Sequence, residues 1–473
     1  MNILLVNPPI PNKFRMLEYA DDEASKIILK RVLVGPPIGL NELAGVVNEE
    51  NVIIIDQKAE LESNPEYNFI EAIEKEISIN KPDIVGITCL TAQYNSVIKL
   101  IQVIKKINRN ILVTVGGLHA TLCPQDFVGT EVDIVSIGIG KYSFYNIVKE
   151  YKKNKTNPDF SKIYGIALNK DGKLHYNKPL SEIPYKDLKE NYLFDHIQPN
   201  RRLTDKYNYW FPGLNRKIDY ISTSQGCTHK CNFCSIWPTT CGHYFHKEIE
   251  YIFRDLKEIR VPSVVRFCDA NTFGDIAKIE EVFKRIIDEG YNYHYYVADI
   301  RAETAAKHPN IIRLAAKAGL KAVICGLEST NDEELKKYKK STSSQIMKEG
   351  LKVLNEEGIM VNGNYIVRPD YEEKNFEDLA KFVQENPIYN SGFTILTPFP
   401  GTQQWEELKH KVVIKDYDYY NLTNAVLETA LDEREFYNQV GQLYKVSGVA
   451  SKEYLNRYDK DQRISKLFQG GTK

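Results

Sequence analysis

The sequence lacks the features that mark exported, membrane-spanning and disulfide-stabilised proteins. No apolar run reaches 18 residues, and Met1 to Asn7 contains neither a basic segment nor an apolar stretch of signal-peptide length. Eight cysteines in 473 residues are too few for a disulfide scaffold. We therefore expect a cytoplasmic protein without an integral membrane span, whose cysteines are thiols or metal ligands.

The sequence also has almost no net charge. Its 62 Lys and Arg residues are balanced by 63 Asp and Glu residues, which leaves a formal charge of −1. Proteins that bind nucleic acid or anionic membranes electrostatically carry a surplus of positive charge. We therefore expect no nucleic-acid partner and favour a small or apolar substrate. Tyrosine is abundant, with 30 residues, and its groups at 293–296 and 417–420 are interpreted as packing.

The first 150 residues alternate between short apolar runs and segments of helical periodicity. This alternation predicts a doubly wound α/β domain, in which helices cover both faces of a parallel sheet. The predicted strands are Ile3–Val6, Val52–Ile55, Ile84–Thr88, Ile111–Val115 and Ile134–Ile137, and the predicted helices lie near 39–49, 68–80, 93–107 and 142–151.

Small and polar residues follow several of these strands. The strand ends read Asn7-Pro-Pro9, Thr88-Cys-Leu-Thr91, Gly116-Gly-Leu-His119 and Gly138-Ile-Gly140. Ligands of such sheets bind at the carboxyl ends of the strands, and small residues there let a large, flat ligand approach the backbone. The same glycines could equally serve tight turns, so both interpretations stay open at this point.

The remainder of the chain predicts a linker, a second α/β unit and a helical appendage. Residues 151–217 are rich in turn residues and predict a linker with a small hairpin. Residues 218–402 predict a partial (βα)6 barrel, and residues 403–473 a helical region that ends in a loose polar tail. The barrel strands are expected at Ile218–Thr223, Val264–Cys268, Tyr293–Ala298, Ala322–Cys325, Val361–Val367 and Phe393–Leu396, and the helices at Glu248–Ile259, Ile279–Glu289, Asn310–Ala318, Ser344–Glu357, Asn375–Gln384 and Asp432–Leu443.

A cysteine motif follows the first barrel strand. Cys227, Cys231 and Cys234 have the spacing C-x3-C-x2-C on one loop, so three thiols can converge on one metal centre. A structural zinc site or an electron-transfer cluster needs four ligands, whereas three thiolates leave one iron of a [4Fe–4S] cluster open. The alternatives are a zinc site completed by His229, His243 or His246, and a four-cysteine cluster that uses Cys241. The position at a barrel strand end favours the open cluster.

With this motif, Phe233 included, the chain resembles the radical S-adenosylmethionine (SAM) superfamily. The resemblance implies that SAM chelates the open iron and that its reductive cleavage yields a 5′-deoxyadenosyl radical. It assigns Arg301 and Glu328 as SAM contacts, with Phe233, Asn271 and Asp299 beside them. These residues lie at successive strand ends of the barrel, although each alone could be a helix cap or a surface ion pair.

The other cysteines carry less functional information. Cys89, Cys123, Cys268 and Cys325 lie in or beside apolar runs and are expected to be core thiols. Cys241 lies in the loop after the cluster motif, and its role stays undecided.

A doubly wound domain ahead of this barrel resembles the cobalamin-binding class of radical SAM enzymes. The closing segment Asp416 to Leu427 looks most like the branch of hopanoid C-methylases and anaerobic magnesium-protoporphyrin cyclases. The resemblance assigns a set of cobalamin contacts at the strand ends. These are Pro8, Thr88, Thr91, Gly116, Gly117, His119 and Gly138.

Two departures from the pattern of this class concern the cobalamin site. No Asp-x-His-x-x-Gly motif occurs, so no histidine is marked as a lower cobalt ligand. The Gly-Glu-Gly-Glu that often follows the fifth strand reads Gly138-Ile-Gly-Lys141.

The preferred function is a cobalamin-dependent radical SAM methyltransferase that methylates an unactivated carbon. Its cofactors would be a [4Fe–4S] cluster, SAM and cobalamin, with reduction by an external donor such as flavodoxin or ferredoxin. The rivals are a non-methylating cyclase, dehydratase or ring-rearranging enzyme with the same cofactors, and a non-enzymatic cobalamin or redox sensor. A lipid, a tetrapyrrole, a peptide side chain or an antibiotic intermediate would suit the barrel mouth.

Overall fold

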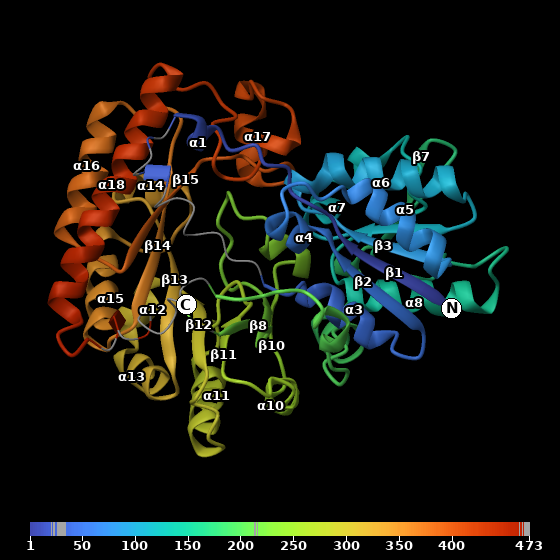
Figure 1. Ribbon diagram of the computed structural model, residues 1–473, viewed down its shortest axis with the longest axis horizontal. Helices are drawn as coiled ribbons and strands as arrows, with labels where there is room; N and C mark the ends of the chain where they lie inside the picture. Colours follow the sequence, from blue (N-terminus) through green and yellow to red (C-terminus); the bar gives the residue numbers. More distant parts are fainter. Residues whose placement is uncertain are drawn as a thin grey trace.

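The computed structural model of the chain has two α/β lobes (Figure 1). The structure describes residues 1–19, 21, 24, 25, 35–211, 214, 216–462, 464, 465 and 467. The N-terminal lobe lies on the right of Figure 1, and the second lobe, with the C-terminal helices on its outer side, lies on the left.

The N-terminal lobe is built on a seven-stranded sheet with the order β2-β1-β3-β4-β5-β6-β7. The first five of these strands pair in parallel, and their carboxyl ends therefore meet at one edge of the sheet. β6 and β7 form the hairpin predicted within residues 151–217, and they extend the sheet as antiparallel strands. The strands are β1 (Asn2–Asn7), β2 (Asn51–Asp56), β3 (Ile84–Thr88), β4 (Leu112–Gly116), β5 (Ile134–Ser136), β6 (Ile166–Lys170) and β7 (Lys173–Tyr176).

Helices cover both faces of this sheet, as the doubly wound prediction requires. One apolar core lies between the sheet and α5 and α6, and a second lies between the opposite face and α3 and α8. The strands consist of β-branched and other apolar residues because both of their faces are buried. The helices are α3 (Ile38–Val46), α4 (Gln57–Ser63), α5 (Phe69–Asn80), α6 (Tyr94–Ile107), α7 (Leu118–Leu122) and α8 (Gly140–Lys153).

The second lobe is an open barrel of six parallel strands in the order β15-β14-β13-β12-β11-β8. Strand order follows chain order, and β8 and β15 form the two edges of the described sheet, as in the predicted partial (βα)6 barrel. The strands are β8 (Lys217–Ile221), β11 (Ser263–Phe267), β12 (Tyr295–Ile300), β13 (Leu320–Glu328), β14 (Met360–Val367) and β15 (Asn390–Ile395).

The main core of the molecule lies between these strands and the helices outside them. The helices are α10 (Ile249–Lys257), α11 (Ile276–Asp288), α12 (Ala302–Lys307), α13 (Pro309–Lys317), α14 (Asp332–Lys337), α15 (Ser344–Glu356) and α16 (Glu373–Glu385).

The C-terminal region packs on the barrel and also contacts the short helix α1 (Arg15–Tyr19). After α17 (Gln403–Leu408), the long helix α18 (Glu433–Tyr458) packs on α16 and β15. The helix α1 contacts α18, where the rings of Tyr19 and Tyr437 stack with centroids 5.0 Å apart. Most of the predicted loose tail lies outside the described residues, but Ile464 is buried beside Tyr454.

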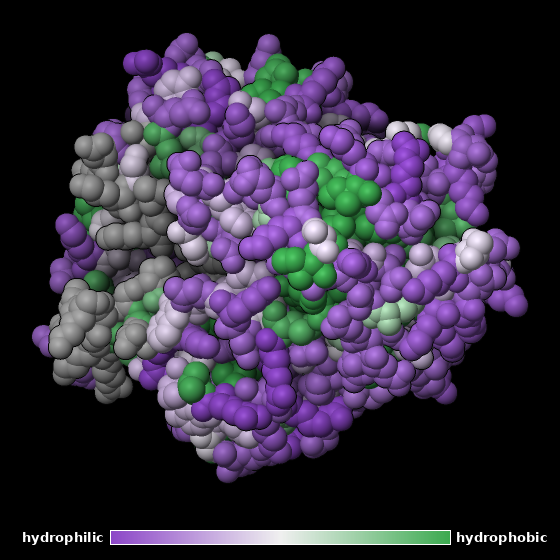
Figure 2. All heavy atoms as spheres, turned by 45° about the vertical axis from the view of Figure 1, so that its right-hand side comes forward, coloured by the Kyte–Doolittle hydropathy of each residue, from purple (hydrophilic) through white to green (hydrophobic). Residues whose placement is uncertain are grey.

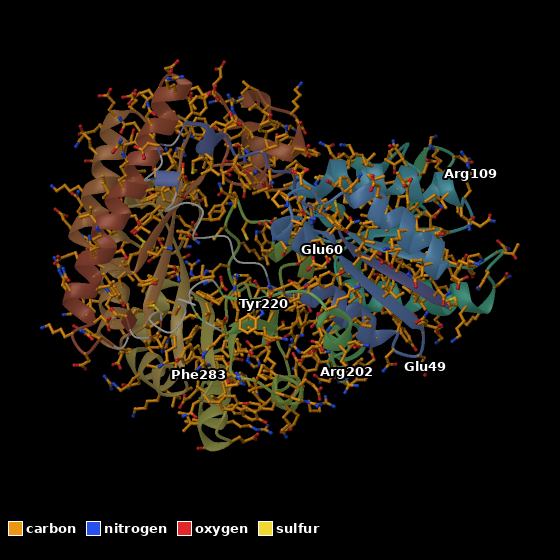
Figure 3. The ribbon with its side chains drawn as sticks, viewed as in Figure 1. Glu49, Glu60, Arg109, Arg202, Tyr220 and Phe283 are labelled. Atoms are coloured by element: carbon orange, nitrogen blue, oxygen red, sulfur yellow. The ribbon has the colours of Figure 1, made fainter. Side chains whose placement is uncertain are left out.

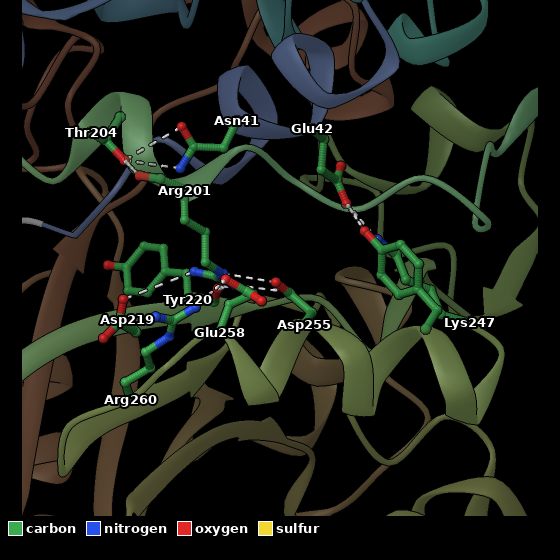
Figure 4. A network of polar contacts seen from close by, with 11 residues as sticks. Asn41, Glu42, Arg201, Thr204, Asp219, Tyr220, Lys247, Asp255, Glu258 and Arg260 are labelled. Carbon is green, nitrogen blue, oxygen red and sulfur yellow. Dashed lines mark hydrogen bonds and ion pairs between the residues drawn. The ribbon is translucent and has the colours of Figure 1, made fainter. Parts of the chain in front are cut away.

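A buried polar network joins the two lobes (Figure 4). Lys247, just before α10, donates to Glu42 of α3 at 2.5 Å, and Tyr251 donates to the same carboxylate at 3.2 Å. Burial alone would raise the pKa of Glu42, but Lys141 and Lys247 lower it to about 2. This ion pair therefore couples the helical face of the N-terminal lobe to the barrel.

A second branch of this network ties the linker to the barrel. Arg201, in the short helix η5 (Arg201–Thr204), binds both carboxylate oxygens of Asp255 at 2.7 Å and also donates to the Tyr220 carbonyl. Two planar groups thus meet in the paired geometry that suits arginine and carboxylate.

The surface seen in Figure 2 is mostly hydrophilic, with a limited hydrophobic area near its centre. Among the described residues, no helix is long and apolar enough to cross a membrane.

Candidate cofactor and substrate site

The cysteine loop is framed by a small hairpin at the carboxyl end of β8. The strands β9 (Ser224–Gly226) and β10 (Tyr244–His246) pair antiparallel on either side of the loop. The buried carboxylate of Asp269 accepts the N–H groups of Thr223 and Ser224, both at 2.8 Å. The entry to the loop is therefore held by the end of the neighbouring strand, β11.

The three cysteines of the motif share this loop. Burial raises the pKa of Cys234 to about 11, and the neighbouring Cys231 and Cys227 thiols contribute to the shift. The Ile236 N–H donates to Cys234 Sγ at 3.4 Å, and the Trp237 indole donates to the Cys231 carbonyl at 3.1 Å. Three thiols on one loop, one of which accepts a backbone N–H at its sulfur, are a donor set that fits a [4Fe–4S] cluster.

Two of the four candidates for a fourth cluster ligand, His243 and Cys241, are engaged elsewhere, whereas the buried Nε2 of His246 has no hydrogen-bond partner. His243 packs against the rings of Tyr185 and Phe245, and Nδ1 of His246 lies 2.7 Å from the Lys247 carbonyl. Cys241 packs against the apolar cluster that contains Phe245. These contacts argue against Cys241 and His243 as a fourth ligand and do not bear on His229 or on Nε2 of His246.

Arg301 and Glu328 lie beside the cysteine loop. Burial raises the pKa of Cys231, and the nearby cations Lys340 and Arg301 partly oppose this shift. Arg301 pairs with Glu303, yet one of its terminal guanidinium nitrogens is buried without a hydrogen-bond partner. Glu328 accepts from Lys340 at 2.7 Å and has a left-handed backbone, with φ of 62°. A buried, unpaired guanidinium nitrogen is suited to the carboxylate of a bound zwitterion.

Of the other predicted SAM contacts, Phe233 lies on this loop and Asn271 contacts it, whereas Asp299 contacts Arg266. Asn271 donates to Thr228 at 3.3 Å, while its own Oδ1 is buried without a partner. Phe233 packs edge-on against Tyr338, with ring centroids 5.5 Å apart. Asp299 lies in β12, two residues before Arg301, and its carboxylate is 3.0 Å from Arg266.

The predicted cobalamin contacts meet at the strand-end edge of the N-terminal sheet. Thr88 and Gly116 are paired at the ends of β3 and β4, and Gln93 donates to the Pro8 carbonyl at 2.6 Å. Gly117 has φ of 99°, and a Cβ there would lie 2.9 Å from the backbone of Cys89, so only glycine fits. This edge exposes Gly117 and the large apolar side chain of Leu90, which is 38% accessible. Small and apolar surface of this kind suits a broad, flat ligand.

Two predicted contacts face away from this open edge. A Cβ on Gly138 would lie 2.7 Å from the Leu180 side chain, so protein packs against this position. His119 is buried, with only 1% of its surface accessible, and its Nδ1 lies 3.3 Å from Thr91 Oγ1. His119 therefore lies behind the edge and reaches it through Thr91.

The two strand-end edges adjoin each other at the junction of the lobes. A Cβ on Gly138 would lie 3.3 Å from the Thr239 carbonyl, which belongs to the short helix η6 (Trp237–Thr240) just after the cysteine loop. A Cβ on Gly401 would lie 2.6 Å from the Leu122 carbonyl of α7. Segments that follow the strands of the two sheets therefore contact each other at this junction.

Comparison with family models agrees with this arrangement. A B12 binding domain model matches residues 24–148, and a Radical SAM superfamily model matches residues 221–383. The chain is a radical SAM protein with an N-terminal B12-binding domain. The resemblance and the fold class inferred from the sequence are thereby confirmed.

Several curated relatives of this radical SAM protein are named as methyltransferases or cyclases. The chain is 30% identical over 264 residues to the hopanoid C-3 methylase of Methylococcus capsulatus, which spans 56% of this chain and half of the relative. It is 28% identical to an uncharacterized methyltransferase of Pyrococcus horikoshii, over 86% of this chain and 83% of that one. An anaerobic magnesium-protoporphyrin IX monomethyl ester cyclase of Rubrivivax gelatinosus is 25% identical, over 85% and 72% of the two chains.

Solved structures of two B12-dependent proteins share the fold. The radical SAM methyltransferase TsrM from Kitasatospora setae, with cobalamin and a [4Fe–4S] cluster bound, aligns with a TM-score of 0.67 and 13% identity over 94% of this chain and 88% of that one. The cobalamin-dependent radical enzyme OxsB aligns with a TM-score of 0.61 and 15% identity over 95% of this chain and 61% of that one. The likeness covers both lobes and thus the arrangement of the two domains.

The prediction that Cys268 is a core thiol is wrong. Cys89, Cys123 and Cys325 are buried as predicted, but Cys268 is exposed. Side chains alternate along β11, so that Val265 and Phe267 enter the helix-side core while Arg266 and Cys268 face the inside of the barrel. Burial nevertheless raises the pKa of the Cys268 thiol to about 11. The thiol is therefore close to other protein atoms, although the residue remains accessible to solvent.

The inner barrel wall contains polar groups that the sequence interpretation missed. Tyr220 of β8 lies at the centre of the molecule, where the lobes meet (Figure 3). Beside it, Arg266 pairs with Asp299, and burial raises the pKa of Asp299 to about 6 although Arg266 opposes the shift. The period-2 alternation of the strands is the sequence signal that could have identified Arg266 and Cys268 as wall residues.

Proposed function

We propose that this protein is a cobalamin-dependent radical SAM C-methyltransferase acting on a small molecule. The observation that supports this most is the junction of the lobes, where the segment just after the three-cysteine loop contacts the B12-binding domain at Gly138 and α7. A substrate at this junction would meet both cofactors at once. The match to the hopanoid methylase covers only half of that protein. The proposal therefore rests on the site in this chain and not on the whole activity of that relative.

The residues near the junction would have distinct roles. Cys227, Cys231 and Cys234 would hold the cluster, with Arg301 and Glu328 binding SAM through charge and Phe233, Asn271 and Asp299 completing its surroundings. Cobalamin would lie on the edge formed by Pro8, Thr88, Thr91, Gly116 and Gly117, with Gly138 behind this edge and His119 supporting Thr91. When bound, these cofactors supply a carbon-centred radical and a methyl group.

This chain's own residues would orient the substrate and keep water away from the reacting carbon. The inner wall offers Tyr220, Arg266 and Cys268 for substrate contact, and its apolar outer layer fixes their positions by close packing. The names of the relatives favour a hopanoid-like lipid or a tetrapyrrole as the substrate class, with a natural-product intermediate as a further candidate. An external one-electron donor such as flavodoxin or ferredoxin would reduce the cluster.

The test is the product pattern of anaerobically reconstituted protein. With a reductant and a candidate substrate, a methyltransferase forms S-adenosylhomocysteine and 5′-deoxyadenosine together. Formation of 5′-deoxyadenosine alone would favour the cyclase-type alternative, which the match to the Rubrivivax enzyme supports. A protein that forms neither with any reductant would be a sensor and not an enzyme.

The cluster assignment has a test that does not depend on the substrate. Cys231→Ala should lose the [4Fe–4S] absorption and all SAM cleavage. Cys241→Ala is the matched control, and it should retain both because its thiol packs against the Phe245 cluster. Equal loss of iron in the two variants would contradict a three-cysteine site.

A further inference from the structure

Three potential metal ligands come together behind the strand-end edge of the B12-binding domain. His119 and Cys123 are one helical turn apart at α7, and Asp126 follows in the short helix η2 (Pro124–Phe127). One ligand atom from each, an imidazole nitrogen, a thiol sulfur and a carboxylate oxygen, lie within 4.8 Å of one another. The spacing H-x3-C-x2-D thus brings three different donor types to one point.

One of these atoms is left without a hydrogen bond. Nε2 of His119 is fully buried and has no hydrogen-bond partner, although it lies only 3.2 Å from Oδ2 of Asp126. An unpaired buried polar atom costs about 1–3 kcal/mol, and a native structure normally avoids it. Two ligands of a tetrahedral zinc ion, each about 2.1 Å from the metal, are about 3.4 Å apart. The separation of Nε2 and Oδ2 therefore suits two ligands of one metal better than a hydrogen bond.

The surrounding residues orient these groups as the outer sphere of a metal site does. The other ring nitrogen of His119 lies 3.3 Å from Thr91 Oγ1, an acceptor for its N–H. Tyr417 donates to the Asp126 carboxylate at 3.0 Å, and Tyr94 donates to the Asp126 carbonyl at 2.6 Å. Outer partners of this kind fix the orientation of ligating imidazoles and carboxylates.

We propose that His119, Cys123 and Asp126 bind one divalent metal ion, with zinc favoured by the nitrogen, sulfur and oxygen donor set. Binding converts the Cys123 thiol to a thiolate and releases its proton to solvent. A water molecule or the second Asp126 oxygen fills the fourth position. The site is separate from the [4Fe–4S] cluster, and the proposal does not depend on methyl transfer.

Such a metal would have a structural role. Asp126 also accepts from Tyr417, which lies in the short helix η8 (Tyr417–Tyr419) of the C-terminal region. The ring of Tyr417 packs against His119, with centroids 5.1 Å apart. A metal here would brace α7, and through Thr91 the proposed corrin edge, against the C-terminal region.

The test uses the full chain with Cys227, Cys231 and Cys234 replaced by alanine, so that cluster thiols do not compete for metal. After dialysis in metal-free buffer and addition of zinc, elemental analysis should find one zinc per chain. Cobalt(II) should give a near-ultraviolet sulfur-to-cobalt charge-transfer band. His119→Ala and Cys123→Ser should lose both signals. Tyr417→Phe should weaken zinc binding about tenfold, as loss of an outer partner does.

The control variant is Cys89→Ser, which removes another buried thiol of the same lobe that is not part of the trio. It should bind zinc and cobalt like its parent. If the triple-alanine background does not fold, the cobalt experiment is repeated on cluster-loaded protein, in which the cluster thiols are occupied. A folded protein, by circular dichroism, that takes up no stoichiometric zinc and shows no thiolate band would overturn the proposal. His119 would then be a core histidine held by Thr91 and Asp126.

Discussion

The buried pair of Glu42 and Lys247 should make a large and pH-dependent contribution to the stability of the junction between the lobes. The side chain of Lys247 is 2% exposed and that of Glu42 is 17% exposed, so water screens the pair weakly. The cations lower the pKa of Glu42 from 4.5 to about 2. A shift of this size corresponds to about 3 kcal/mol. Because the folded-state pKa is depressed, this stability is present above pH 4.5 and is lost as the pH falls towards 2.

Removing one partner tests this magnitude. Lys247→Met should lower the free energy of unfolding by about 3–5 kcal/mol, because it leaves Glu42 charged and buried. The double variant Glu42→Gln/Lys247→Met should recover part of the loss, since no unpaired charge remains. Lys336→Met is the control, because Lys336 and Glu333 form a pair in which both side chains are more than 70% exposed. The assay is urea denaturation, followed by circular dichroism at pH 7 and at about pH 3, where the contribution of the pair should be smaller. Equal losses for Lys247→Met and Lys336→Met would refute the reasoning.

Three further variants test features of the junction and the barrel. Arg201→Lys removes the paired contact with buried Asp255 and should cost about 2–3 kcal/mol in urea denaturation; no loss would mean that a single contact suffices. Gly117→Ala places a Cβ at a position with a positive φ, and it should reduce both hydroxocobalamin binding and the free energy of unfolding. Gly39→Ala is the control, because a Cβ at Gly39 meets no atom within 4 Å, and it should leave both quantities unchanged. Cys268 should react with iodoacetamide in the intact protein, and the rate should rise about tenfold per pH unit up to its pKa of about 11, because the thiolate is the reactive form. Protection of the thiol at every pH would show that the barrel interior is closed to the reagent.

Much of the fold follows from the sequence because both sheets are buried on their two faces. Strands buried in this way are continuous apolar runs, and each of the eleven predicted parallel strands overlaps an observed one. The short helices α7, α12 and α14 were not predicted, since five or six residues are too few to show a helical period. The helix predicted at Asp432–Leu443 extends to Tyr458 because its later turns pack on the barrel, which a weak local pattern does not reveal.

Site residues that lie close together in the sequence can be predicted from their spacing. Site residues that depend on which side chains are buried together are harder to predict. The cysteine motif identifies its three residues directly, because ligands on one loop must be close in sequence. To predict Arg266 and Cys268 as wall residues, one must know which face of β11 points to the barrel interior, and the strand pattern alone does not give this. Part of the packing around His119 comes from Tyr417, almost 300 residues later in the chain, and no local pattern carries that information.

The contact between α1 and α18, which lie far apart in the sequence, has a consequence for how the protein is made. The Arg15 N–H donates to Asn424, a partner 409 residues later in the chain, and α1 rests on α18. At a synthesis rate of roughly 5–20 residues per second, α1 leaves the ribosome roughly 20–80 s before its binding surface exists. The N-terminal sheet can form early because its strand pairings lie within the first 176 residues. The segment that includes α1 must wait, exposed to chaperones and proteases, until translation is nearly complete.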